Sequence, residues 1–169
     1  MKVPEISLRR VPVAEAAAMV RGDQPPEPGP RWHPEYPMSD TFSAIAMLQR
    51  AYEHSGVTDV AEPHWWIHQM VLDGEVVGDC GFHGPPAVDE RPVAVEVGYN
   101  VVPAMRRRGI GRRACALLLD LAWSQGADVV TAETEVDNVA SQNVLLGNGF
   151  GFVGPGEYVI VNPHAGGRG

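Results

Sequence analysis

Residues 93–114 read VAVEVGYNVVPAMRRRGIGRRA, and this stretch decides the fold. Its first part, residues 93–102, is rich in β-branched and aromatic side chains, so we expect a strand that Pro103 ends. A short basic loop with two glycines follows over Arg106–Gly111. A helical spacing of apolar residues comes next, at Ile110, Ala114, Leu117, Leu118 and Leu121. The stretch therefore predicts a strand, a glycine loop and a helix in direct succession.

The junction between this loop and this helix has the chemistry of an anion site. The first backbone N–H groups of a helix have no partner within the helix, and the helix dipole places partial positive charge there. Gly109 and Gly111 let a ligand come close to the backbone because they carry no Cβ. The loop also concentrates five guanidinium groups, those of Arg106, Arg107, Arg108, Arg112 and Arg113. Guanidinium groups suit phosphate oxygens, so we expect a phosphorylated ligand such as a pyrophosphate.

Two kinds of nucleotide site fit this spacing. Gly109-x-Gly111-x-x-Ala114 satisfies the loose dinucleotide fingerprint, which makes a nucleotide-binding oxidoreductase one hypothesis. A doubly wound domain needs several βα units after its fingerprint, however, and only 55 residues follow Ala114. Three consecutive arginines also separate the strand from the glycines, where that fold requires a tight turn. These two features favour the second hypothesis, a resemblance to another family.

The motif Arg106-x-x-Gly109-x-Gly111 resembles the (Gln/Arg)-x-x-Gly-x-(Gly/Ala) motif of the GCN5-related N-acetyltransferases (GNAT). In that family the loop holds the pyrophosphate of acetyl-CoA. Residues 96–103 resemble the branch that acetylates ribosomal-protein N-termini. Further landmarks of the family follow at the expected spacing, namely Asn138-x-x-Ser141 and Gly149-Phe150. The resemblance extends from about residue 64 to residue 161.

The resemblance implies an α/β (α+β) fold. It would be a three-layer α/β/α sandwich with a mixed, mostly antiparallel central sheet that splays at the fourth strand. We expect strands over residues 5–11, 64–72, 75–82, 93–102, 127–135, 150–153 and 158–161, and helices over 13–21, 41–54, 109–125 and 138–146. Asp73-Gly74 predicts a hairpin between the second and third strands. Residues 1–162 would form a single N-acetyltransferase domain, and residues 163–169 a flexible tail.

The resemblance also assigns a site for acetyl-CoA. At the splayed strand, the backbone N–H of Asn100 or Val101 would face the acetyl oxygen. Val102 would pair with the pantetheine arm as a neighbouring strand does. The rest of the coenzyme would lie on Arg106, Arg107, Arg108, Gly109, Ile110, Gly111, Arg112 and Asn138.

Acetyl transfer to an amine requires a base, because an alkyl ammonium has a pKa of about 10.4. Glu96, four residues before Asn100, matches the glutamate that serves as base in the histone-acetylating members. We expect its neighbours Val95 and Val97 to raise the pKa of Glu96 by desolvation. His83, at the end of the neighbouring strand, is a second candidate base.

The resemblance supplies fewer residues for the protonation of the leaving CoA thiolate. Ser141 resembles a serine of the ribosomal-protein branch that can hydrogen-bond the CoA sulfur. Many members carry a tyrosine seven residues after the Asn138 equivalent, where it protonates the leaving thiolate, but this chain has Leu145 there. A catalytically silent acyl-CoA-binding module is therefore the alternative to an N-acetyltransferase.

Composition limits the partners and the location. The net charge of −8 argues against nucleic acid, and with five of the 13 basic residues in the loop, the acidic remainder favours a cationic acceptor. We expect a primary amine on a small molecule or a peptide N-terminus. No apolar run approaches ~18 residues and the N-terminus lacks an apolar signal core, so we expect a cytoplasmic protein without a membrane partner.

Two further expectations concern metals and assembly. The spacing His64-x-x-x-His68 lies in a β-rich segment without a third ligand nearby, so we expect no metal. Because proteins related in this way are often dimers, we also expect that a homodimer can form.

Overall fold

The sheet is built around one hairpin. Strands β3 (Ile67–Leu72) and β4 (Glu75–Phe82) are antiparallel neighbours. Asp73 and Gly74 join them with φ angles of 50° and 76°, the left-handed conformation that a tight hairpin turn of this kind requires. The hairpin predicted from Asp73-Gly74 is confirmed.

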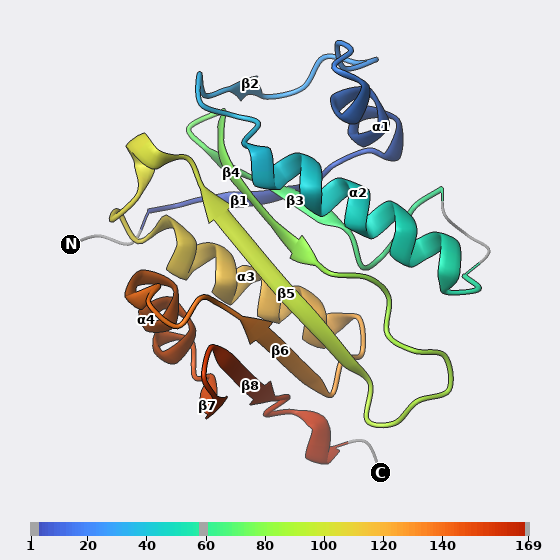
Figure 1. Ribbon diagram of the computed structural model, residues 1–169, viewed down its shortest axis with the longest axis vertical. Helices are drawn as coiled ribbons and strands as arrows, with labels where there is room; N and C mark the ends of the chain where they lie inside the picture. The colour runs from blue at the N-terminus through green and yellow to red at the C-terminus, as the bar shows by residue number, and fades with distance from the viewer. Residues whose placement is uncertain (1–3, 58–60, 168–169) are drawn as a thin grey trace.

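The computed structural model describes residues 4–57 and 61–167 (Figure 1). The other elements are β1 (Ser7–Arg10), α1 (Val13–Arg21), β2 (Arg31–Trp32), α2 (Ser39–His54), β5 (Ala94–Val101), the 3₁₀ turn η1 (Pro103–Met105), α3 (Ile110–Ser124), β6 (Val129–Glu133), α4 (Val139–Gly147), β7 (Gly151–Gly154), β8 (Glu157–Val161) and the 3₁₀ turn η2 (Ala165–Gly167). Within these residues the strands form one eight-stranded sheet, in the order β1-β3-β4-β5-β6-β8-β7, with β2 beside β4.

Helices cover both faces of this sheet. On β4, Asp79 accepts a hydrogen bond from Thr41 of α2, whereas the next residue, Cys80, lies near Cys115 of α3. Successive side chains of a strand point to opposite faces, so α2 and α3 lie on opposite sides of the sheet. α1 packs with α2 and α4 packs with α3 (Figure 1). The predicted three-layer, mostly antiparallel fold is confirmed.

Strand β5 parts from β6 halfway along its length. β5 pairs in parallel with β6 only from Ala94 to Val97, while it stays paired with β4 as far as Val101. Figure 1 shows the two strands diverging beyond that point. The splay lies on the fourth strand predicted from the sequence, which is the fifth in the structure because β2, which was not expected, lies between α1 and α2.

Most boundaries agree with the sequence to within a few residues. The helix expected from residue 41 begins at Ser39, and its N-cap is Met38, whose N–H donates to the Thr41 hydroxyl (3.2 Å). The expected flexible tail contains η2, and residues 168–169 lie outside the described residues. None of the described helices is long and apolar enough to span a membrane.

Candidate active site

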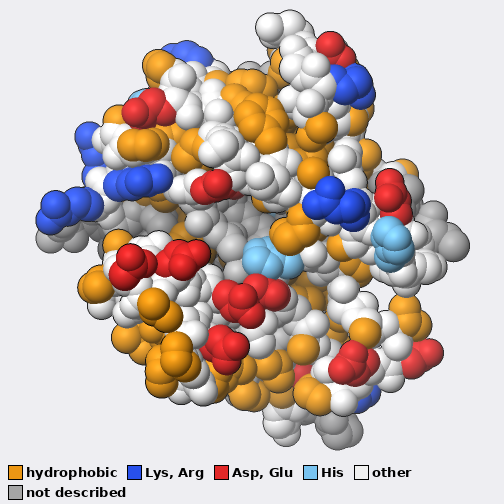
Figure 2. All heavy atoms as spheres, in the orientation of Figure 1, with side chains coloured by type: hydrophobic (Ala, Val, Ile, Leu, Met, Phe, Trp, Pro, Cys, Tyr) orange, Lys and Arg blue, Asp and Glu red, His pale blue; other side chains and the backbone are white. Residues whose placement is uncertain are grey.

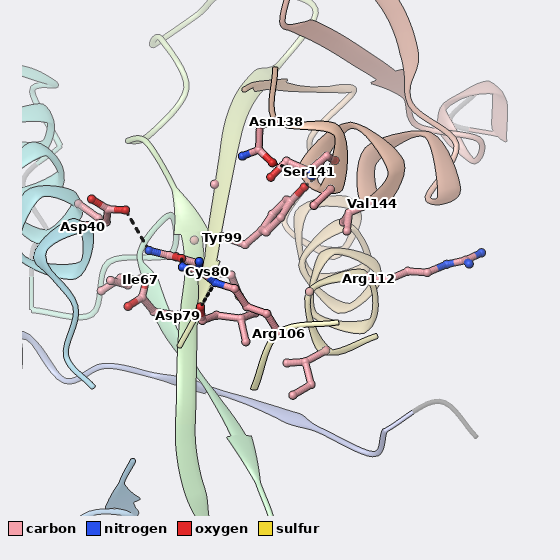
Figure 3. A pocket seen from close by; sticks show the side chains of 18 of the residues that line it. Asp40, Ile67, Asp79, Cys80, Tyr99, Arg106, Arg112, Asn138, Ser141 and Val144 are labelled. Atoms are coloured by element: carbon pink, nitrogen blue, oxygen red, sulfur yellow. Dashed lines mark hydrogen bonds between the residues drawn. The ribbon is translucent and has the colours of Figure 1, made fainter. Parts of the chain in front are cut away.

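A cavity of about 1070 Å³ opens where β5 and β6 diverge. Figure 2 shows the face onto which it opens, which is hollowed near its centre with acidic and histidine side chains around the hollow. Figure 3 shows part of the lining from close by. α2 contributes Asp40, Ser43, Ala44, Met47 and Leu48; the sheet contributes Ile67, Asp79–His83 and Gly98–Val101; the loop and α3 contribute Pro103, Met105–Arg107 and Gly109–Arg112; and α4 with its cap contributes Asn138, Ala140, Ser141 and Val144.

One wall of the cavity is the start of α3. Arg107 and Gly109 have φ angles of 61° and 78°, and such left-handed residues turn successive N–H groups toward a common point. The first helical hydrogen bond runs from Arg113 N–H to Gly109 C=O (3.1 Å). The N–H groups of Ile110, Gly111 and Arg112 therefore precede the hydrogen-bonded ladder of the helix and are available to an anion.

Gly111 leaves room above these N–H groups. A Cβ at this position would have its nearest neighbours, on Val101, Tyr99 and Val144, at 3.8–3.9 Å, so the protein itself does not fill the space. That space belongs to the cavity. The donors, the exposed arginines around them and the open space together fit a phosphate group.

Arg106 is tied to β5. Its Nε donates to the Val101 C=O (2.9 Å), and its Nη2 lies 3.4 Å from Asn100 Oδ1. Asn100 in turn donates from Nδ2 to Asp40 Oδ2 (3.0 Å), which links the loop to the first turn of α2 (Figure 3). Arg106 thus holds the loop against the parted strand.

The backbone groups of β5 alternate in direction. His83 N–H donates to Glu96 C=O, and Val102 N–H donates to Val77 C=O, both at 2.9 Å. Hydrogen-bonded pairs recur at every second residue of an antiparallel ladder, so the N–H of Asn100 also points toward β4. The N–H groups of Tyr99 and Val101 point the other way, into the space that β6 has left.

Two expectations from the sequence therefore need correction. Val102 was expected to pair with pantetheine, but its N–H is held by Val77, its C=O accepts from Met105 N–H (2.9 Å), and its side chain is buried. Asn100 was one of two candidates to present its N–H to the acetyl oxygen, and the ladder directs that N–H to β4. The backbone of Tyr99 and Val101 supplies the outward-facing groups instead.

The start of α4 forms the opposite wall. Asn138 caps the helix by accepting the Ser141 N–H at its Oδ1 (3.1 Å). Tyr99 donates its hydroxyl to the Ser141 C=O (3.1 Å), so β5 and α4 are joined across the cavity floor (Figure 3). This contact was not anticipated from the sequence, in which Tyr99 is only one of several aromatic residues.

His83 and Glu96 form a hydrogen-bonded side-chain pair beside the cavity. His83 Nδ1 lies 3.0 Å from Glu96 Oε1, and the two side chains are 37% and 33% exposed. The hydrogen bond from His83 lowers the pKa of Glu96 and outweighs the opposing effect of burial. Our expectation that desolvation raises this pKa was wrong, because the strand register brings a histidine against the carboxylate.

Asp79 is an acidic residue of the site that the sequence analysis missed. It is 5% exposed and lines the cavity beneath Asp40. Burial raises its pKa to about 7, although the Thr41 hydroxyl donates to it. The available signal was an aspartate inside the apolar stretch Val76–Phe82, since acidic residues are seldom buried without a partner.

Residues 5–151 match the family described as Acetyltransferase (GNAT) domain. The chain belongs to this GNAT acetyltransferase family. No curated protein sequence shows a significant match. Solved structures share the fold: yncA from Salmonella typhimurium, solved with acetyl-CoA, is 21% identical with a TM-score of 0.57, covering 95% of this chain and 96% of that chain.

Two more structures extend this comparison. RimJ from Mycobacterium smegmatis, in complex with CoA-disulfide, is 21% identical with a TM-score of 0.62, over 96% of this chain and 84% of that chain. The aminoglycoside acetyltransferase AAC(6')-Ib, in complex with coenzyme A, is 12% identical with a TM-score of 0.61, over 94% and 95%. Membership of the GNAT family indicates acetyl transfer.

The structure gathers most of the predicted GNAT site residues around one cavity. Those that line it are Asn100, Val101, Arg106, Arg107, Gly109, Ile110, Gly111, Arg112, Asn138 and Ser141. Three predicted residues lie outside the lining, namely Glu96, Val102 and Arg108. Glu96 contacts His83, Val102 is buried, and Arg108 is exposed within the loop. Leu145, at the position of the GNAT tyrosine, is 1% exposed in the core. The described residues contain no group of three or more metal-ligating side chains.

Proposed function

We propose that this GNAT protein is an acetyl-CoA-dependent N-acetyltransferase that acetylates a primary amine by direct attack of the amine on the thioester. The observation that carries the proposal is the parting of β5 from β6 beside the start of α3, both opening into one cavity. A thioester at the parted strand would meet an acceptor entering from the α2 side. Asp40 on that side favours a cationic acceptor, such as an amine-bearing small molecule or a peptide N-terminus.

The loop and α3 would bind the coenzyme. The N–H groups from Arg107 to Arg112 would hold its pyrophosphate, with charge added by exposed Arg108. Arg106 would keep the loop in place through its bond to the Val101 C=O. Asn138 would contribute by capping α4 so that the first turn of that helix faces the coenzyme.

The parted strand would stabilise the reacting carbonyl. The N–H of Val101 faces the gap, and a donor held there would favour the charge that develops on the acetyl oxygen. Ser141, whose N–H is held by Asn138, would place its hydroxyl near the sulfur. A thiol with an ordinary pKa near 8.5 can leave with hydrogen-bond help, so the core position of Leu145 does not prevent transfer.

The test is turnover by the purified protein with acetyl-CoA and a panel of amines, followed as release of free thiol. We expect thiol release that depends on the amine and a matching acetylated product in the mass spectrum. CoA affinity is measured in parallel. Tight binding without turnover by any amine would support the alternative, a catalytically silent acyl-CoA-binding module, which the buried Leu145 at the tyrosine position favours.

The panel also tests the narrower parts of the proposal. A peptide with a free N-terminal amine addresses the ribosomal-protein branch, and polyamines, aminoglycosides and amino acids address small-molecule acceptors. Sedimentation at several concentrations tests the expected homodimer. We keep the cytoplasm as the expected location.

A further inference from the structure

We propose that His83 is the base that takes the proton from the attacking amine, and that Glu96 acts through it as a positioning residue. This inference rests on the proposed N-acetyltransferase function. His83 and Glu96 are then no longer alternative bases but a pair, in which His83 accepts the proton and Glu96 orients His83.

The strand register places the two side chains together. His83 N–H donates to the Glu96 C=O (2.9 Å), so the residues form a hydrogen-bonded pair across β4 and β5. Directly opposed residues of a sheet project to the same face. The side chains meet there, with His83 Nδ1 3.0 Å from Glu96 Oε1.

This contact fixes the orientation of the imidazole. A carboxylate only accepts hydrogen bonds, so the proton of the pair lies on Nδ1 and the lone pair lies on Nε2. Nε2 is 2.8 Å from the point that a Cβ on Gly98 would occupy, which places it directly over the backbone of β5. Gly98 follows Val97, the last residue of β5 that pairs with β6, so Nε2 lies at the mouth of the parted strands.

Glu96 is poorly suited to act alone. It does not line the cavity, whereas His83 and Gly98 do. Its hydrogen bond with His83 lowers its pKa, which makes the carboxylate a weaker base. An imidazole is the side chain whose ordinary pKa lies nearest neutral pH, which suits proton transfer under working conditions.

The proton balance is simple. The amine lone pair attacks the thioester carbon, the N–C bond forms and the C–S bond breaks. Nε2 accepts a proton from the attacking nitrogen, and the departing CoA thiolate takes up one proton. When the acceptor starts as an ammonium ion, one proton is released to solvent per turnover. His83 and Glu96 are unchanged at the end.

A double-mutant cycle separates the two roles. His83→Gln should lower kcat by roughly 10²–10⁴-fold, the usual effect of losing a general base, with little change in CoA affinity. Glu96→Gln should lower kcat by a smaller factor. In the His83→Gln background, Glu96→Gln should have no further effect, because a positioning residue acts only through its partner.

A third variant disturbs the pair without removing either group. Gly98→Ala adds a Cβ 2.8 Å from His83 Nε2, and the imidazole can rotate away because it is the end of a side chain. We expect kcat to fall while the fold and CoA affinity persist. His54→Gln and Glu53→Gln are matched controls, since both residues are exposed on α2 outside the cavity lining.

The acceptor supplies a second readout. An amine whose own pKa lies well below the assay pH is already neutral and needs less help from a base. The loss caused by His83→Gln should therefore shrink with such an acceptor. The inference is overturned if Glu96→Gln costs as much as His83→Gln, if their effects multiply, or if His83→Gln keeps wild-type kcat. Absence of turnover in the wild-type protein would instead defeat the proposed function.

Discussion

The buried carboxyl of Asp79 makes the stability of the fold depend on pH in an unusual direction. Its pKa rises from 3.8 to about 7 on folding, mainly because burial penalises the charged form. The folded state thus holds this proton more tightly than the unfolded chain does. The stabilisation is fully present below about pH 4 and is lost as the pH rises toward and through 7.

The magnitude follows from the shift. About three pKa units correspond to ~4 kcal/mol of unfolding free energy between pH 4 and pH 8, as an upper estimate. Asp79→Asn removes the titration and keeps an oxygen that can accept the Thr41 hydroxyl. We therefore expect the variant to gain stability over the wild type progressively from pH 4 to pH 8.

Urea denaturation followed by tryptophan fluorescence at five pH values between 4 and 8 measures this difference. The informative quantity is how the stability difference between Asp79→Asn and the wild type changes with pH. A difference of the same size at every pH would reflect only the replacement of a carboxyl group by an amide. Thr41→Val is the informative second variant. The Thr41 hydroxyl lowers the pKa of Asp79, so its loss should extend the pH-dependent region to higher pH. A stability difference that does not vary with pH would refute the reasoning.

Three further results are expected. Gly111→Glu should raise the Kd for CoA by roughly tenfold or more, about 1.4 kcal/mol, because it puts a carboxylate where the cavity would take a phosphate. Isothermal calorimetry measures this Kd, and Gly166→Glu, in the C-terminal turn, is the control. Asn138→Ala should lower the unfolding free energy by ~1 kcal/mol through loss of the α4 cap, which chemical denaturation would detect as a lower midpoint. CoA affinity should fall several-fold between low salt and about 0.5 M salt, because the arginine loop attracts the phosphates electrostatically; a salt-independent Kd would contradict this.

Local sequence patterns were sufficient to predict most helices and strands and the anion site at the start of α3. Residues 13–21 and 75–82 match α1 and β4 because the alanine-rich composition of the first and the Asp73-Gly74 turn before the second are local signals. The helix expected over 138–146 matches α4, whose cap at Asn138 involves groups only three residues apart. The glycines at 109 and 111 marked the start of α3 for the same reason.

What the sequence did not reveal depends on pairing between distant segments. β2 lies in a segment with many prolines and exists only because Arg31 and Trp32 pair with β4. The pKa of Glu96 falls rather than rises because His83, 13 positions earlier, is its partner in the register. Asp79 is buried because α2 covers it. The pairing of β2 with β4 and of His83 with Glu96 leaves no pattern in the local sequence, whereas the burial of Asp79 leaves one, an aspartate within an apolar stretch.

The alternating orientation of residues along β5 explains how one strand can contact both the coenzyme and the acceptor amine. Even-numbered residues turn their backbone groups to β4 and their side chains toward α2: Asn100 reaches Asp40, Glu96 reaches His83, and Gly98 leaves space for the imidazole. Odd-numbered residues turn their side chains toward α3 and α4, as Tyr99 does to Ser141. Beyond Val97 their backbone groups face the gap left by β6. A register shift of one residue would exchange these sets and place the base on the coenzyme side, so the register of β4 with β5 determines the chemistry.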